Sequence, residues 1–156
     1  MRRNRAVRHA IAAALAAAGT IGVAAAQDRI PGPVPADLVR VVDGDTLRVR
    51  AWIWIDQSIE VLVRIRGVDA PELRAGCPEE RAQADAATAF LALAVGIGPL
   101  SLTAVEGDKY FGRVVADVDS AGTDLAAALF ASGLARPYDG GTRATWCPDL
   151  VASGAG

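Results

Sequence analysis

Two alternating runs of apolar residues, one directly after the other, are the feature that most limits how this chain can fold. The first run, LVRVVDGDTLRVRAWIWI (38–55), is broken by the turn dipeptide Asp43-Gly44, and the second is IEVLVRIRGV (59–68). Alternation of this kind is typical of strands that bury one face. The runs therefore predict three consecutive strands that fold back and forth, which favours an antiparallel sheet over a doubly wound parallel one.

Two helices and two further strands follow. Residues 77–96 predict a helix, since Pro78 suits its first position and Gly96 its end. Its expected apolar stripe consists of Ala82, Ala86, Phe90 and Leu93. The second helix is expected at 123–133, with Thr123 as its N-cap.

The two further strands are expected at 100–108 and 112–119. Five short strands with an inserted helix fit a small barrel of the OB type. We therefore expect an α+β protein, mainly β, in which a five-stranded barrel is accompanied by two or three helices.

The amino terminus has the composition of an export signal. Four arginines and no acid precede an uncharged, alanine-rich stretch that ends at an A-x-A site, so residues 1–26 are expected to be a signal peptide. The proline-rich residues 27–37 predict a linker, residues 38–150 the domain, and residues 151–156 a flexible tail. The expected location is periplasmic or secreted, with no membrane attachment after the signal is removed.

Removal of residues 1–26 changes which chemistry is available. It leaves 12 basic against 18 acidic residues, a net charge of −6, and it removes His9, the only histidine. Nucleophilic sites that need an imidazole base and histidine-ligated zinc sites are thereby excluded. A protein that holds nucleic acid by overall charge should be basic, so a polyanionic substrate would have to meet a local positive site or a bound cation.

Cys77 and Cys147 are the only cysteines. An even pair in an exported protein indicates a disulfide. Two buried thiols, or one reactive thiol, are the alternatives that the sequence leaves open.

Three groups of charged residues lie at strand ends. Asp45 follows the Asp43-Gly44 turn. Asp69 and Glu72 follow the expected strand that carries Arg64. Arg113 follows Lys109 and Tyr110 in DKYFGR (108–113). Carboxylates from two strands suit a hard divalent cation, and arginines suit a phosphate. Each group alone also has an ordinary interpretation as a polar turn or a surface ion-pair network. Trp52 and Trp54 share a strand face and are expected to pack on the barrel or sheet rather than to stack on bases.

The order of four motifs resembles the thermonuclease, or staphylococcal-nuclease-like, family. The motifs are DGDT (43–46), RIRGVDAPE (64–72), DKYFGR (108–113) and LARPY (134–138), and the resemblance covers about residues 38–138. It implies an OB barrel with helices. It also implies Ca²⁺-dependent hydrolysis of DNA and RNA, single-stranded or frayed, that leaves 3′-phosphates. We expect the protein to act as a monomer.

The resemblance also assigns roles to individual residues. It implies Ca²⁺ ligands at Asp45, Asp69 and the carbonyl of Ala70, with Asp43 as an acid behind them. The implied catalytic residues are Arg64, Glu72 and Arg113, and the implied substrate contacts are Lys109, Tyr110 and Tyr138. Phe111 is an extra residue where the family commonly has K-Y-G-R, and the family's third helix is truncated or absent after Tyr138. Residues 145–150 are expected to replace that helix, tied to the first helix through Cys147 and Cys77.

Two alternatives stay open. One is an OB-fold module that binds nucleic acid or another partner without cleaving it. The other is an exported protein that has no role with nucleic acid.

Overall fold

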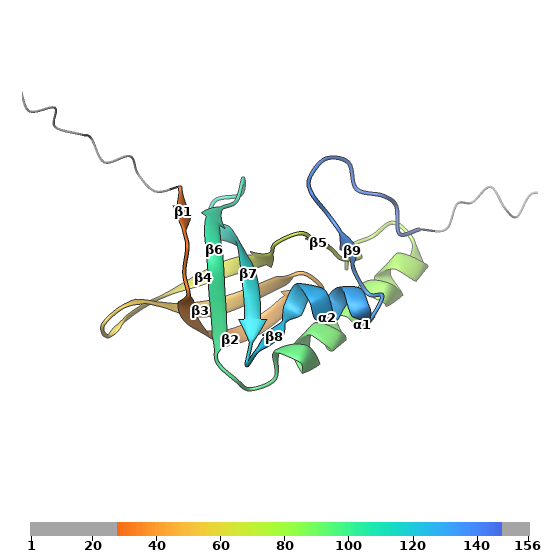
Figure 1. The fold of residues 1–156 in the computed structure, drawn as a ribbon. Helices are drawn as coiled ribbons and strands as arrows, with labels where there is room; N and C mark the ends of the chain where they lie inside the picture. Colours follow the sequence, from red (N-terminus) through yellow and green to blue (C-terminus); the bar gives the residue numbers. More distant parts are fainter. Residues whose placement is uncertain (1–27, 148–156) are drawn as a thin grey trace, which may run out of the picture.

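Five strands close into a barrel in the computed structural model, which describes residues 28–147 (Figure 1). The ring runs β2–β3–β4–β7–β6 and returns to β2; its one parallel pair is β4–β7, and the other pairs are antiparallel. The expected five-stranded α+β barrel of the OB type is therefore confirmed. The strands of the ring are β2 Val34–Asp43, β3 Thr46–Trp54, β4 Gln57–Ile65, β6 Leu100–Gly107 and β7 Arg113–Ser120.

Four two-residue strands extend or flank this ring. β1 (Arg29–Ile30) pairs with β6, and β8 (Thr123–Asp124) pairs with β7. β5 (Val68–Asp69) and β9 (Arg136–Pro137) form a separate two-stranded sheet. Because β1 and the start of β2 lie inside the expected linker 27–37, the ordered sheet begins before residue 38, where the domain was expected to start.

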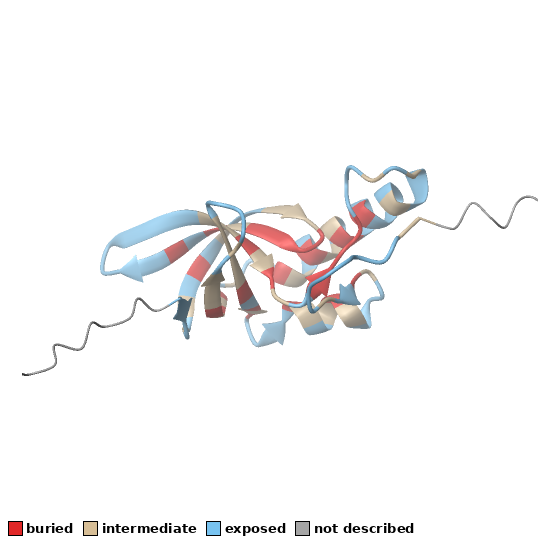
Figure 2. Ribbon diagram, turned by 90° about the horizontal axis from the view of Figure 1, so that it is seen from above, coloured by how far each residue is buried: buried red, intermediate tan, exposed pale blue. Residues whose placement is uncertain are grey.

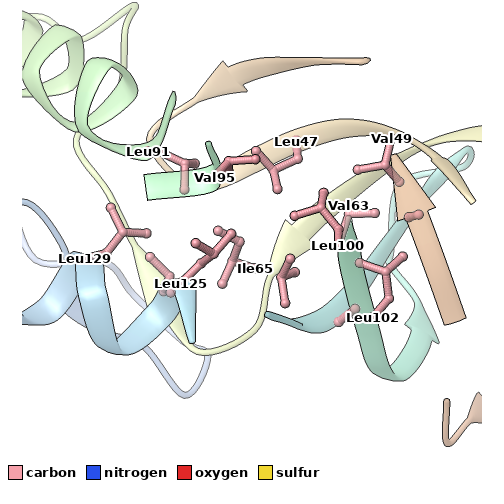
Figure 3. Packing of buried hydrophobic residues seen from close by; sticks show 14 of the residues in the cluster. Leu47, Val49, Val63, Ile65, Leu91, Val95, Leu100, Leu102, Leu125 and Leu129 are labelled. Carbon is pink, nitrogen blue, oxygen red and sulfur yellow. The ribbon is translucent and has the colours of Figure 1, made fainter. Parts of the chain in front are cut away.

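The hydrophobic core fills the barrel and continues under the helices (Figure 3). Alternate residues of the strands point inward, as the period of two requires. Leu91 and Val95 from α1 (Pro78–Val95) and Leu125 and Leu129 from α2 (Leu125–Ala131) close the core. The barrel contributes Leu47, Val49, Val63, Ile65, Leu100 and Leu102.

Helix α1 begins and ends as expected, but it buries a different face. Cys77 is its N-cap and Pro78 its first residue. Its buried residues are Ala84, Ala87, Leu91 and Val95, whereas Ala82, Ala86 and Leu93 are exposed and Phe90 is half-buried. The expected stripe was therefore wrong. Alanines lie on both faces of the helix, so the apolar pattern distinguishes these faces poorly.

Helix α2 is shorter than expected and has a different N-cap. The carboxylate of Asp124 accepts hydrogen bonds from the backbone N–H groups of Ala126 and Ala127 at 2.9 and 3.1 Å. Thr123 instead lies in β8. Asp is as good an N-cap as Thr or better, so the chain starts the helix one residue later than the prediction.

The far end of the β3–β4 hairpin projects beyond the barrel and is exposed on both faces (Figure 2). Trp52 is 42 % exposed and Trp54 is 72 % exposed, so the expectation that both pack on the sheet was wrong. Trp52 Nε1 donates a hydrogen bond to Asp37 at 2.8 Å.

The expected signal peptide (1–26) and tail (151–156) lie outside the described residues. Two helices are present between residues 28 and 147, the lower of the two numbers expected. Neither of these helices has the length and apolar character needed to cross a membrane.

Candidate active site

The turn between β2 and β3 presents a buried carboxylate. Asp43 Oδ1 accepts a hydrogen bond from the backbone N–H of Asp45 at 3.1 Å, which stabilises the turn. A Cβ on Gly44 would lie 2.8 Å from the Cβ atoms of both Ala70 and Ala87. Only glycine allows this turn to pack so closely against α1 and the segment after β5. The DGDT motif therefore places Asp45 in the interior rather than on a solvated rim.

Arg64 holds the Asp45 carboxylate from the neighbouring strand. Thr46 and Arg64 are register partners in the β3–β4 pair, so Arg64 lies beside the β2–β3 turn. Its Nη1 lies 2.7 Å from Asp45, and its Nη2 donates to the carbonyl of Val68 at 2.8 Å. Arg66, two residues along, instead forms ion pairs with Glu106 and Asp117. Of these two arginines, the predicted site residue Arg64 is the one that contacts Asp45.

Burial and neighbouring charges perturb two groups in the site. Burial raises the pKa of Asp45 to about 6, and the charge of Asp43 adds to this rise, although Arg64 opposes it. Burial disfavours the charge of Arg143, but the hydrogen bond that Arg143 donates to the Glu72 carboxylate and the charges of Glu72 and Asp69 outweigh this effect and raise its pKa. Burial therefore dominates the shift of Asp45, whereas the neighbouring carboxylates dominate that of Arg143.

Asp69 lies in β5, next to Ala70, which packs against the β2–β3 turn at Gly44. Asp69 is 3 % exposed. Its Oδ2 accepts a hydrogen bond from Trp146 Nε1 at 3.2 Å. Its Oδ1 is 3.0 Å from Arg143 Nε, in a geometry that makes an ion pair but no hydrogen bond. A buried carboxylate oxygen without a hydrogen-bond donor among the described residues is suited to a hard cation. The donor set of Asp45, Asp69 and the adjoining buried Ala70 therefore fits a divalent ion such as Ca²⁺.

Glu72 lies at the open edge of the site. Its side chain is 56 % exposed, and its carboxylate pairs with Arg143. Its backbone N–H donates to Glu80 Oε1 of α1 at 3.2 Å, which ties this corner of the chain to the first turn of the helix. Glu72 is thus a carboxylate held at the mouth of the site, with access to water.

Arg113 lies at the start of β7 and reaches the site from that strand. Its Nε pairs with Asp108, and its guanidinium carbon lies 4.6 Å from the centre of the Tyr110 ring. Lys109 Nζ also lies near that ring, at 5.2 Å. Phe111 is fully exposed at the turn, so the turn accommodates the extra residue and Arg113 still begins the strand.

These segments line one open cavity of about 790 Å³. Its lining is mainly polar and includes arginines from both β4 and β7. Asp69 is not part of this lining, but it contacts Arg143, which does line the cavity. Among the predicted site residues, the lining includes Asp43, Asp45, Arg64, Ala70, Glu72, Lys109, Tyr110, Arg113 and Tyr138.

A C-terminal segment, of which only Tyr138 was predicted to belong to the site, completes it. Tyr138, whose N–H donates to Gly67 at 2.8 Å, brings the chain back beside β5. Residues 138–147, which we call the strap, form the loop that follows β9 (Figure 1). They carry Arg143 and Trp146 to Asp69 and end at the disulfide between Cys77 and Cys147. The predicted disulfide is confirmed. The spacing of Cys77 from Glu72 was the one signal that residues near Cys147 reach this corner.

Comparison with known proteins gives a family for this arrangement. The family model described as staphylococcal nuclease homologue matches residues 62–146, more than half of the chain. The matched span includes Arg64, Asp69, Glu72 and Arg113, whereas Asp45 precedes it. No curated protein matches the chain.

Proposed function

We propose, from the premise that this chain belongs to the staphylococcal nuclease homologue family, that it hydrolyses phosphodiester bonds of DNA and RNA with the help of Ca²⁺. The products are fragments that end in 3′-phosphates. The proposed location is the periplasm or the exterior of the cell, because the amino-terminal sequence has the form of an export signal. We propose that it acts as a monomer on single-stranded or frayed substrate.

One observation carries this proposal. Two guanidiniums and a water-accessible carboxylate, Arg64, Arg113 and Glu72, line the same cavity as the buried Asp45, and these four residues come from three separate segments. Phosphodiester hydrolysis needs positive charge around the phosphate and a group that orients or deprotonates water. The site supplies both without a histidine, in agreement with the loss of His9 that the export signal implies.

Asp45, Asp69 and the carbonyl of Ala70 are the proposed cation ligands. A divalent ion bound there would neutralise charge on a nonbridging phosphate oxygen. This effect would stabilise the transition state by roughly several kcal/mol. The two aspartates are 4 % and 3 % exposed, so their oxygens are already withdrawn from bulk water. Asp43 fixes the Asp45 backbone and thereby the direction of that carboxylate.

The two arginines have the role of binding the phosphate. Arg64 is fixed by Asp45 and by the Val68 carbonyl, so its fork is oriented before a substrate arrives. Arg113 is oriented by Asp108 and by the Tyr110 ring. Planar guanidiniums fixed in this way stabilise the charge that develops on the phosphoryl oxygens, since they need no reorganisation during the reaction.

Glu72 is the proposed general base, and nearby residues are proposed to contact the substrate. Its exposure lets its carboxylate hold a water molecule next to the phosphate and accept its proton, a contribution of about 10²–10⁴-fold. Lys109, Tyr110 and Tyr138 line the rim, where an ammonium and aromatic rings suit backbone phosphates and bases. A negatively charged protein can in this way hold a polyanion locally.

The test is a cleavage assay on the purified chain. Single-stranded DNA and RNA are incubated with Ca²⁺ and then with excess EGTA, and end-group analysis identifies the 3′-phosphate. We expect Ca²⁺-dependent cleavage that falls by at least about 10²-fold in Glu72→Gln and Arg113→Gln. Arg50→Gln, in an exposed ion pair on the β3–β4 hairpin, is the control and should cleave normally. Full activity in EGTA or in Glu72→Gln would falsify this mechanism.

A binding module without catalysis is the second candidate. The observation that favours it is that each proposed catalytic side chain already has an ionic partner: Arg64 with Asp45, Glu72 with Arg143, and Arg113 with Asp108. Fluorescence anisotropy with a labelled oligonucleotide separates the two candidates. Tight binding with or without Ca²⁺, and intact oligonucleotide after long incubation, would favour the module.

A further inference from the structure

Arg143 lies where a bound cation would be expected. Its Nε is 3.0 Å from Asp69 Oδ1, and its Nη1 pairs with Glu72 Oε1. The guanidinium thus bridges one proposed cation ligand and the proposed base. Its side chain is 34 % exposed, so it lies inside the rim of the cavity rather than free in solvent.

The strap holds Arg143 at this position from both sides. On the amino-terminal side, Asp69 and Arg136 are register partners in the β5–β9 pair, and the Tyr138 hydroxyl donates to the Gly141 carbonyl at 2.8 Å. On the carboxyl-terminal side, Arg136 stacks on the Trp146 ring at 3.6 Å, and the Cys77–Cys147 disulfide ends the strap. Four residues span at most about 14 Å, so Arg143 stays near the disulfide.

A divalent ion cannot coordinate Asp69 Oδ1 while the Arg143 guanidinium lies against that oxygen. Ca²⁺ binds carboxylate oxygens at about 2.3–2.6 Å and needs several more ligands around it. With Arg143 Nε at 3.0 Å from Asp69 Oδ1, that coordination sphere overlaps the guanidinium. Because the strap is tethered at both ends, Arg143 competes at a high effective concentration, in the millimolar range or so for a short tether.

We propose that Arg143 is a built-in competitor for the cation site, which the disulfide-tethered strap holds on Asp69 and Glu72 until a divalent ion displaces it. The inference rests on the proposed function, because it concerns the regulation of the same site. It makes the strap a latch that neutralises the buried acid when no ion is bound. Cation binding and release of Arg143 from Glu72 then occur together, so the proposed base becomes free only in the loaded site.

Calorimetric titration of the full chain with Ca²⁺ tests this latch. Arg143→Gln should bind Ca²⁺ about tenfold more tightly than the unmodified chain, since a charge-assisted contact is removed from the competing state. Arg74→Gln is the matched control: it removes the same charge from an exposed position two residues after Glu72. An affinity gain in Arg143→Gln no larger than that in Arg74→Gln overturns the proposal.

A second variant tests the tether and leaves every cavity residue in place. Cys77→Ser/Cys147→Ser frees one end of the strap, so it should also bind Ca²⁺ more tightly, by a smaller factor than Arg143→Gln because β9 still anchors the other end. Circular dichroism confirms that each chain is folded at the titration temperature. Weaker or unchanged binding in this folded variant contradicts the role given to the disulfide.

The outcomes separate this inference from the proposed function. Tighter Ca²⁺ binding in Arg143→Gln, without nucleic-acid cleavage by any chain, supports the latch and removes the nuclease proposal. Ca²⁺-dependent cleavage without a gain in Ca²⁺ affinity specific to Arg143→Gln supports the nuclease proposal and overturns the latch. If no chain binds Ca²⁺, the latch is overturned, because Arg143→Gln should leave Asp69 available to the ion.

Discussion

Asp45 shows most clearly how burial and function conflict at a single residue. Its carboxylate is 4 % exposed, and its pKa is raised to about 6 even though Arg64 lies 2.7 Å away. An acid that is harder to ionise in the folded state costs stability once it is ionised. A bound cation would remove that cost, and such a strained carboxylate is the kind of group found at functional sites.

The raised pKa of Asp45 predicts an unusual dependence of stability on pH. In the unfolded chain this acid ionises near its ordinary value of 3.8, whereas in the folded chain it keeps its proton up to about 6. Between these pH values the folded state binds more protons, so the contribution of Asp45 to stability falls as the pH rises, by roughly 3 kcal/mol in total. Urea unfolding in EGTA from pH 4 to 7 should show this fall, and Asp45→Asn should lack it. Equal slopes for both chains would contradict the assignment.

Substitution of Gly44 should cause a steric clash with two particular neighbours. Gly44→Ala places a methyl group 2.8 Å from Ala70 and Ala87, so the turn or helix α1 has to move. The expected cost is about 1–3 kcal/mol in the free energy of unfolding, measured by urea denaturation. Gly76→Ala is the control, since its added Cβ would meet nothing within 4 Å. A similar, small cost at both positions would show that the close approach at Gly44 is easily relieved.

Motif spacing predicted most of the residues that meet at the cavity, but not all of them. Asp45, Arg64 and Arg113 come from separate segments and line the same space. Their short motifs have a fixed geometry relative to the strand ends, which made this placement predictable. Arg143 belongs to no such motif. It reaches Asp69 because a disulfide and the β5–β9 pair route the strap there, and a long-range path of this kind leaves no local pattern.

At the scale of single elements, the sequence located α1 but not its buried face. Its caps and acidic first turn are local signals, and they predicted its start and end. Its buried face depends on which side meets the barrel, and alanines on every side carry little information about that. The β3–β4 hairpin shows the same limit. The alternating pattern predicts its two strands, but how much of each strand lies within the barrel is decided by the packing of the whole ring.

Two leucines on α1 provide a matched test of this helix face. Leu91 is fully buried and Leu93 is 82 % exposed, although they are two residues apart. Leu91→Ala should lower the free energy of unfolding by about 2–5 kcal/mol, whereas Leu93→Ala should change it by less than about 0.5 kcal/mol. Urea denaturation of both variants measures the difference. A larger loss at Leu93 would restore the face that the sequence pattern predicted.

At the scale of the whole molecule, closure of the barrel brings the site together. The parallel β4–β7 pair joins strands that are separated by α1 and β6, and its register sets Leu62 opposite Arg113 and Arg64 opposite Val115. The two site arginines therefore lie on neighbouring strands. Element order predicted a barrel of the right size, but the parallel closure follows from how the ring packs and not from any single segment.

The disulfide should contribute substantially to the stability of the whole chain. It joins residues 70 positions apart, for which the chain-entropy model gives roughly 4 kcal/mol. Cys77→Ser/Cys147→Ser should therefore lower the free energy of unfolding by about that amount in urea denaturation. The unmodified chain in excess dithiothreitol should behave like the variant. If the variant unfolds at the same urea concentration as the oxidised chain, the closed loop is not what stabilises this fold.

The same cross-link encloses the exposed β6–β7 turn within a covalent ring from residue 77 to residue 147. A protease such as trypsin that nicks the backbone after the exposed Lys109 therefore cannot separate the two fragments. On a denaturing gel the nicked protein should migrate as one band until a reductant is added, and then as two. The exposed rim of the cavity can thus be clipped while both halves remain attached.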